Sequence, residues 1–182
     1  MNPIYWDLGD GVAIRTYTPD DAEEAFALVD ANRVRLHPWM IWEPRTRSPA
    51  DTRAFIERCL ASETDIEGNG IWVDGRLAGS MGLRVDVQDA GAEIGYWIGG
   101  DFEGRGIITR ACRRFFDFAF DDLGLHRMEL CAAVGNTRSR SVAERLGMRQ
   151  EGVLRGGVRN PEGFDDLVVY GILEDEWRAQ AP

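Results

Sequence analysis

The stretch from residue 91 to residue 123 decides the fold and reads GAEIGYWIGG, DFEGRGIITRA and CRRFFDFAFDDL. In its first segment Ile94, Tyr96 and Ile98 alternate with smaller or polar residues, which predicts a strand. In its last segment apolar residues recur at helical spacing until Gly124, which predicts a helix that ends there. Those apolar residues are Ile108, Ala111, Cys112, Phe115 and Ala119. The chain therefore passes from a strand to a helix through a short turn.

Gly104 and Gly106 lie in this turn. The first N–H groups of a helix have no internal partner and lie at the positive end of its dipole. Glycine also lets an anion approach the backbone without a Cβ in the way. The turn is thus a candidate phosphate site, although an ordinary glycine loop explains the pair equally well. It lacks the Lys-Ser/Thr of a nucleoside-triphosphate loop and the three-glycine spacing of a dinucleotide site.

The composition is that of a globular chain with a single domain. The chain has 182 residues, of which 44% are hydrophobic and 29% charged, and this length suits one core. No apolar run is long enough to cross a bilayer, and the first residues do not look like a secretion signal. The net charge of −10 disfavours nucleic acid as a partner and can attract cationic amines, although solubility alone also explains it.

The three cysteines, Cys59, Cys112 and Cys131, lack paired spacing. This pattern predicts neither a disulfide framework nor a zinc site, and a reducing cytoplasm is the natural compartment. We expect Cys112 and Cys131 to serve as small buried hydrophobic residues. No metal site is expected.

The rest of the chain predicts further elements around this centre. Strands are expected at residues 11–17, 70–73, 77–87, 128–134, 149–154 and 166–173. Helices are expected to begin at the N-caps Thr18 and Ser48, and a short one to end at Gly147. The helix after Ser48 would bury Ala54, Phe55 and Leu60. The 128–134 strand would be buried throughout, and a glycine-rich polar loop would separate the last two strands. The expected order, β-α-α-β-β-β-α-β-α-β-β, gives a mixed α/β sheet.

Four runs in this order carry a resemblance to a known family. Residues 93–98 read EIGYWI, 102–109 read FEGRGIIT, 135–139 read GNTRS and 144–148 read ERLGM. The chain resembles the GNAT acyltransferases, and most closely the RimJ/RimL branch of ribosomal-protein N-terminal acetyltransferases. The resemblance covers nearly the whole chain and implies one domain, residues 1–182. It implies a mostly antiparallel mixed sheet flanked by helices, in which a splayed parallel strand pair, around Tyr96 and Leu130, holds acetyl-coenzyme A (acetyl-CoA).

The resemblance also implies which residues hold the donor. The pyrophosphate would lie on the N–H groups of the glycine turn, and the pantetheine arm would pair with the strand edge near Tyr96. Arg105 and Thr109 would add side-chain contacts, or face solvent. The chain departs from the family pattern Q/R-x-x-G-x-G/A at two positions. Glu103 occupies the first position, where the family has Gln or Arg, and Ile108 occupies the last, where it has Gly or Ala. The cofactor-binding residues are Tyr96, Trp97, Ile98, Gly104, Arg105, Gly106, Ile107, Ile108, Thr109, Asn136 and Ser139.

The chemistry needs a proton acceptor for the amine and donors for the thioester oxygen and the leaving thiolate. Many GNAT enzymes carry a tyrosine in the later helix as the proton donor to the thiolate, and this tyrosine is absent here. The resemblance to the RimL type points to Ser139 as the donor instead. A purely structural helix-start role is the alternative for Ser139 and for Asn136. Glu93 is the candidate base, or a carboxylate that only attracts the cation. The later base of the RimL type has no counterpart, since residues 155–158 read RGGV.

The expected function is acetyl transfer to a primary amine by direct attack on the thioester. By resemblance, the acceptor is the α-amine of a protein or peptide; a small-molecule amine and a non-catalytic CoA-binding module are the alternatives. Trp39 and Trp42 flank a proline-broken segment and are expected to wall the acceptor site, or to be core residues under a loop. Neither nucleic acid nor a membrane is expected as a partner, a homodimer is possible by resemblance, and the location is cytoplasmic.

Overall fold

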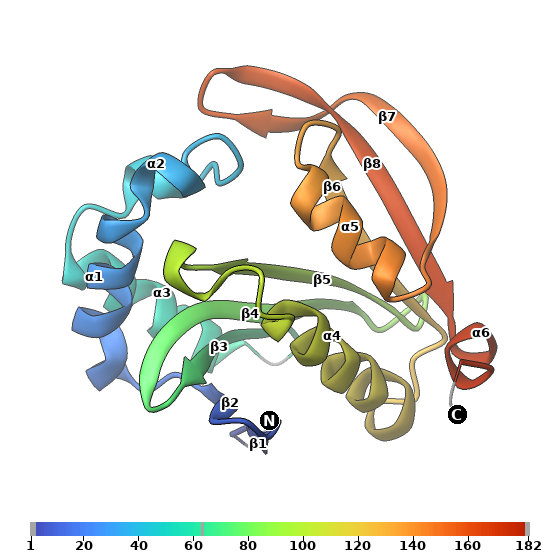
Figure 1. Cartoon of the computed structure of the whole chain (residues 1–182), viewed down its shortest axis with the longest axis horizontal. Helices are drawn as coiled ribbons and strands as arrows, with labels where there is room; N and C mark the ends of the chain where they lie inside the picture. Colours follow the sequence, from blue (N-terminus) through green and yellow to red (C-terminus); the bar gives the residue numbers. More distant parts are fainter. Residues whose placement is uncertain (1–2, 63, 181–182) are drawn as a thin grey trace.

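One eight-stranded sheet organises the computed structural model, which describes residues 3–62 and 64–180. The strand order is β1-β2-β3-β4-β5-β6-β8-β7, and β5 with β6 is the parallel pair among antiparallel neighbours. This confirms the predicted mixed, mostly antiparallel sheet (Figure 1). The strands are β1 Tyr5–Asp7, β2 Val12–Thr16, β3 Ile66–Val73, β4 Arg76–Asp86, β5 Gly91–Ile98, β6 Arg127–Ala133, β7 Arg149–Asn160 and β8 Gly163–Leu173.

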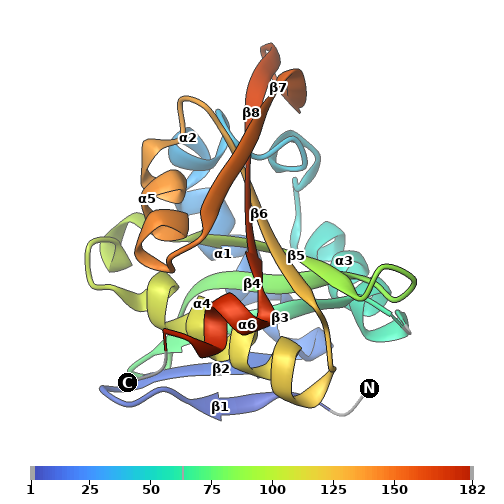
Figure 2. The same ribbon diagram turned by 90° about the vertical axis from the view of Figure 1, so that its right-hand side faces the viewer.

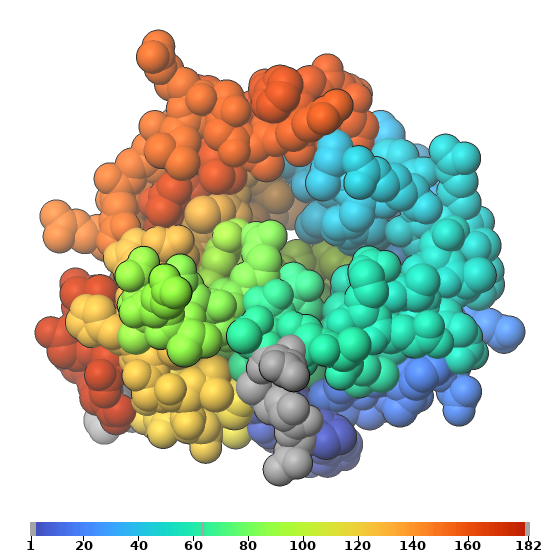
Figure 3. Space-filling model, turned by 180° about the vertical axis from the view of Figure 1, so that it is seen from behind, coloured from blue at the N-terminus to red at the C-terminus, as the bar shows by residue number. Residues whose placement is uncertain are grey.

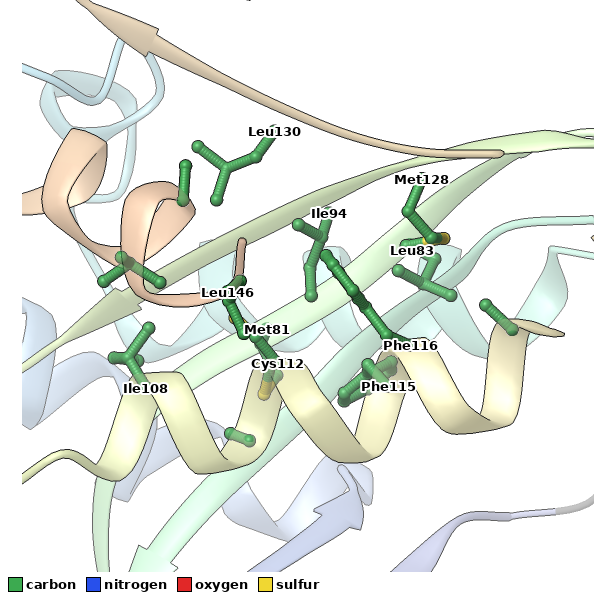
Figure 4. Close-up of a cluster of buried hydrophobic side chains, with 14 of the residues drawn as sticks. Met81, Leu83, Ile94, Ile108, Cys112, Phe115, Phe116, Met128, Leu130 and Leu146 are labelled. Carbon is green, nitrogen blue, oxygen red and sulfur yellow. The ribbon is translucent and has the colours of Figure 1, made fainter. Parts of the chain in front are cut away.

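Helices cover both faces of the sheet. They are α1 Ala22–Ala31, α2 Arg33–Leu36, α3 Pro49–Ala61, α4 Ile107–Asp117, α5 Thr137–Arg145 and α6 Glu174–Arg178. The apolar stripe of α4 packs on one face, where Cys112, Phe115 and Phe116 are fully buried near Ile94 and Met128 (Figure 4). On the other face, α1 and α3 enclose a smaller cluster around Ile56 and Trp72. Helical spacing of apolar residues thus buries each helix on one side.

The parallel strands β5 and β6 pair over a short distance and then separate. Their register joins Gly91–Glu93 to Arg127–Glu129 and goes no further. Beyond it, β5 stays paired with β4 as far as Ile98, and β6 with β8 as far as Ala133. Figures 1 and 2 show the two strands diverging beside α5. The expected splay around Tyr96 and Leu130 is therefore confirmed, and it leaves two facing strand edges open.

The end of the chain differs from the sequence prediction. The expected glycine-rich loop between residues 154 and 166 is wrong, because β7 and β8 continue through it as a long hairpin. Gly156, with φ of +59°, lies in a register shift between Leu154 and Val158. The glycines therefore form a bulge inside the hairpin, and pairing resumes after it.

Two predicted burial patterns and one strand also need correction. In α3, Ala54 is exposed and Leu60 is 48% exposed, whereas Ile56 is fully buried. Strand β6 is buried at alternate residues only, so Cys131 is half-buried while Cys112 is buried as expected. One face of β6 borders an open cavity, which a sequence of small apolar residues does not reveal. Strand β1 was not predicted, since its Tyr-Trp-Asp sequence is too short for a periodic pattern.

Candidate active site

The turn between β5 and α4 presents a row of free backbone N–H groups. Gly104 and Gly106 have φ of +73° and +70°, and Gly106 is the N-cap of α4. Within the described chain, no N–H from Gly104 to Thr109 donates to a backbone carbonyl. Residues 104–109 all line the cavity beside the splayed strands. We call residues 104–109 the donor cradle.

The donor cradle has room for an anion against its backbone. A Cβ at Gly104 or Gly106 would have no heavy atom within 4 Å. Residues 104–106 are exposed, whereas Ile107 and Ile108 are buried and anchor the start of α4 in the core. Ile108 therefore faces the core at the place where the family pattern has Gly or Ala. Free N–H groups, a helix N-terminus and an unfilled space are what a phosphate group requires.

Glu103, which precedes the cradle, is held by two arginines. Arg35 of α2 and Arg138 of α5 both donate to its Oε2 atom, Arg138 at 2.5 Å. The Glu103 side chain is 28% exposed, so it does not point freely into solvent. We call this group the arginine clasp. It links three separate segments at the mouth of the cradle and offsets the negative charge of Glu103 there.

Ser139 and Tyr96 meet across the splay. The Tyr96 hydroxyl lies 3.0 Å from Ser139 Oγ, which joins β5 to α5. Burial raises the pKa of Tyr96 well above its ordinary value, and this tyrosine stays protonated at neutral pH. Asn136 accepts from the Ser139 N–H at 3.2 Å and is the N-cap of α5. The pair thus offers two hydroxyl groups at the place where the resemblance puts the thiolate donor.

A large cavity joins these features. Its volume is about 1800 Å³, and its lining includes the donor cradle, the hydroxyl pair and parts of β3, β4 and β5. Seen from behind, the molecule is hollowed between the β3–β5 region, the 30s–40s segment and the β7–β8 hairpin (Figure 3). The cavity thus extends from the donor cradle to this rear opening.

We call residues 33–46 the acceptor wall. Trp39 and Trp42, the two tryptophans expected at the acceptor site, belong to this segment and line the cavity. Trp42 packs against Trp97 of β5 with ring centroids 6.1 Å apart. The ring of Trp39 lies 3.5 Å from the place of a Cβ at Gly135, so it reaches toward the loop before α5. Trp39 is 36% exposed. Neither residue is simply core, and both border the space between the two halves of the molecule.

The acceptor wall is supported by a buried carboxylate. Glu43 is 4% exposed and accepts from Arg33 and His37, each at 2.7 Å. Burial opposes ionisation of Glu43, but the bonds from His37 and Arg33 outweigh it and lower its pKa. Arg33 also donates to the Thr46 carbonyl at 2.7 Å. These bonds fix a segment that has little regular structure.

Glu93 lines the cavity near the point where β5 and β6 separate. Its carboxylate lies 2.9 Å from Arg84 of β4, the residue paired with it in the sheet. The Glu93 side chain is 32% exposed. It therefore faces the rear part of the cavity as a carboxylate already paired with a cation.

A sequence profile described as the acetyltransferase (GNAT) domain matches residues 12–149. The chain belongs to the GNAT acetyltransferase family. YdaF of Bacillus subtilis (strain 168), provisionally named a ribosomal N-acetyltransferase, is 39% identical over 95% of this chain and 97% of its own length. The match spans the fold, the donor cradle and the hydroxyl pair.

Two solved structures of this GNAT fold are also similar to the chain. One is the microcin C7 self-immunity acetyltransferase MccE in complex with acetyl-CoA and AMP, with a TM-score of 0.85 and 26% identity, covering 91% of this chain and 94% of that one. The other, the ribosomal L7/L12 acetyltransferase RimL in complex with coenzyme A, has a TM-score of 0.88 at 18% identity over 93% and 98% of the chains. The RimL structure shows the shared fold, and the resemblance to the RimJ/RimL type is confirmed by YdaF through its name as a ribosomal N-acetyltransferase.

Sequence reasoning missed several residues that line this GNAT cavity. Arg35 and Arg138 have no local signal, since their partner Glu103 is far away in the chain. Glu67 of β3 also lines the cavity. The one signal for it is Gly68, because a glycine within a strand often marks a bulge.

Proposed function

We propose that this chain transfers the acetyl group of acetyl-CoA to the N-terminal α-amine of a protein or peptide. The observation that carries the proposal is the position of the donor cradle at the open edge of the β5–β6 splay, within one cavity. A phosphate-bearing thioester needs both an anion site and a strand edge for its amide-containing arm. The YdaF name supports a ribosomal-protein acceptor, and such an acceptor implies work in the cytoplasm.

The donor cradle would hold the pyrophosphate through the N–H groups of residues 104–109, with Arg105 and the Thr109 hydroxyl beside them. The free edge of β5 at Tyr96, Trp97 and Ile98 would pair with the pantetheine arm. Asn136 would contribute by fixing the start of α5 rather than through its side-chain amide alone, because its Oδ1 already accepts from Ser139 N–H. Acetyl-CoA supplies the activated acyl group, and the protein supplies position and proton transfer.

In the chemical step, Ser139 would donate to the departing thiolate, with Tyr96 behind it at 3.0 Å. Backbone N–H groups near Trp97 would stabilise the charge on the thioester oxygen. Glu93 would draw the ammonium group of the acceptor into the rear of the cavity. Attack is direct in this proposal, since Cys112 is buried and the burial raises its thiol pKa far above its ordinary value.

A small-molecule amine is the second candidate acceptor. The Trp42–Trp97 contact gives the cavity an aromatic wall, and MccE, at 26% identity, is described with AMP bound beside acetyl-CoA. A peptide N-terminus stays the first candidate, because YdaF, the relative at 39% identity, carries the name of a ribosomal N-acetyltransferase.

Thiol release from acetyl-CoA tests the proposal with two acceptor panels. One panel holds peptides with free and with blocked N-termini, and the other holds polyamines, amino acids and aminonucleosides. We expect release with free peptide N-termini only. The chain contains no lysine, so self-acetylation of side-chain amines adds no background. Release only with the second panel would replace the acceptor class, and binding of acetyl-CoA without any release would favour a non-catalytic module.

A further inference from the structure

Strand β3 leaves the regular ladder at Glu67. The register with β4 shifts between Ile66 and Asn69, and Gly68 has φ of +76°. A Cβ at Gly68 would lie 2.7 Å from Cys59 Cβ, so the bulge depends on glycine both for conformation and for space. A bulge re-aims the side chain next to it. Glu67 is the residue that this bulge displaces into the cavity lining.

The bulge lies beside a paired couple of glycines, Gly82 and Gly95, where the sheet carries no side chains; we call this pair the Gly82–Gly95 floor. A Cβ at Gly82 of β4 would lie 2.6 Å from the Glu67 Cα, so the β3 backbone folds over that face of Gly82. Gly82 pairs with Gly95 of β5, where a Cβ would meet nothing within 4 Å. Paired residues share a face, and Glu93 and Trp97 share it with Gly95. Glu67 therefore borders the same bare floor as the expected acceptor residues.

The two carboxylates beside this floor differ in their partners. Glu93 is paired with Arg84 at 2.9 Å, whereas Glu67 has no ion-pair partner within the described residues. Burial raises the pKa of Glu67, with Asp65 and Glu93 adding to the rise while Arg84 and Arg58 oppose it. Cys59 of α3 also faces the bulge. A half-buried carboxylate with a raised pKa suits proton transfer, and a paired one suits charge attraction.

We propose that Glu67 accepts the proton from the acceptor's ammonium group above the Gly82–Gly95 floor, while Glu93 positions that group. This assignment rests on the proposed function. One N–H proton passes to the Glu67 carboxylate and then to water. The neutral amine forms the N–C bond to the thioester carbon and the C–S bond breaks. The attacking nitrogen loses one of its two remaining protons and keeps the other as the amide N–H, while Ser139 donates a proton to the coenzyme sulfur and regains one from that nitrogen.

The distances suit this role. Strands lie about 4.8 Å apart, so the β3 backbone is roughly 10 Å from β5. The bulge brings the Glu67 Cα over Gly82 of β4, the strand next to β5. The Glu67 side chain therefore has one strand spacing, about 4.8 Å, to cross toward β5. One water molecule or the amine itself completes the path.

The test compares Glu67→Gln with Glu57→Gln, a carboxylate of α3 that is exposed and outside the cavity lining. Each is assayed with an alkyl-amine peptide and with an aryl amine, which is already neutral at pH 7. We expect kcat/KM of Glu67→Gln to fall on the order of a hundredfold with the alkyl amine. With the aryl amine it should change by about twofold or less, and the acetyl-CoA Kd should stay constant as a check on folding.

An equal fall with both amines would assign Glu67 a structural role and overturn the proposal. An unchanged rate with the alkyl amine would do the same and leave the proton to Glu93 or water. Glu93→Gln should instead raise KM for the alkyl amine more than it lowers kcat. If the unaltered chain releases no thiol with any amine, the proposed function itself fails, an outcome distinct from a Glu67 variant that alone loses activity.

Discussion

The donor cradle and the acceptor wall border the same cavity but are held in different ways. The cradle, residues 104–109, consists of backbone N–H groups set by two left-handed glycines and the start of one helix. The wall, residues 33–46, has short helical turns and is fixed by side chains around the buried Glu43. A backbone site depends on local conformation, whereas a side-chain site depends on partners. The two regions should therefore respond to different substitutions and to different conditions.

The largest effect should come from filling the cradle. In Gly106→Leu the side chain would enter the space now open at that position and displace a phosphate from at least two N–H groups. At about 1.5 kcal/mol for each charge-assisted bond, the acetyl-CoA Kd should rise about a hundredfold, as measured by calorimetry.

Gly124→Leu is the matched control for this substitution. Gly124 has φ of +64° and also has nothing within 4 Å of its Cβ position, but it lies after α4 and away from the cavity. Both variants bear the backbone strain of a left-handed residue, about 1–2 kcal/mol. Equal losses of affinity in the two would mean that strain, and not the cradle, explains the result.

The contrast between the regions also explains what the sequence could reveal. The strand, the turn and the start of α4 follow from alternation, glycines and helical spacing within one stretch, and the structure confirms them. The predicted helix end at Gly124 needs correction, because α4 ends at Asp117 and a π-helical turn, Phe118–Asp122, follows it. The arginine clasp, the Tyr96–Ser139 contact and the Glu67 bulge join segments far apart in the chain. Their geometry depends on how the sheet brings those segments together, which no local pattern encodes. The two strands β7 and β8 were predicted, but their continuation through residues 154–166 was missed for a related reason, since the same glycines suit a loop or a bulge.

The next effect concerns the hydroxyl pair. Ser139→Ala removes the group expected to meet the thiolate and leaves the donor cradle intact. We expect kcat to fall about thirtyfold, which is less than the roughly hundredfold or more typical of a lost proton or hydrogen-bond donor, because the Tyr96 hydroxyl remains beside the site. The acetyl-CoA Kd should change less than about threefold. Steady-state kinetics gives kcat, and calorimetry gives the acetyl-CoA Kd separately.

Tyr96→Phe sharpens this result, because it removes the other hydroxyl of the 3.0 Å contact. If Tyr96 acts only through Ser139, the double variant should be no slower than Ser139→Ala alone. An unchanged kcat in Ser139→Ala would make the serine a structural residue of α5.

A smaller effect is expected at the arginine clasp, where the two regions touch. Glu103→Gln removes the negative charge beside the donor cradle and frees Arg35 and Arg138 for phosphate. Acetyl-CoA should bind about fivefold more tightly, and more salt-dependently, since guanidinium groups then face the phosphates. Weaker binding would show that Glu103 instead holds the two arginines in their useful positions.

The smallest expected effect is a pH-dependent change in amide exchange that occurs in the acceptor wall and not at the donor cradle. The pKa of Glu43 is lowered in the folded chain, so its stabilisation is present above its ordinary value of 4.5 and is lost as the pH falls through the lowered value. In Glu43→Gln, amide exchange in residues 33–46 should be about fivefold faster at pH 7, which corresponds to about 1 kcal/mol. Below pH 4.5 this difference should shrink, because the Glu43 carboxylate of the opened segment binds a proton there, and it should vanish once the pH is below the lowered pKa of the folded chain. Exchange in α4 should be the same in both proteins, since backbone bonds hold the cradle; an equal acceleration there would mean that Glu43 stabilises the whole fold and that the two regions are not independent.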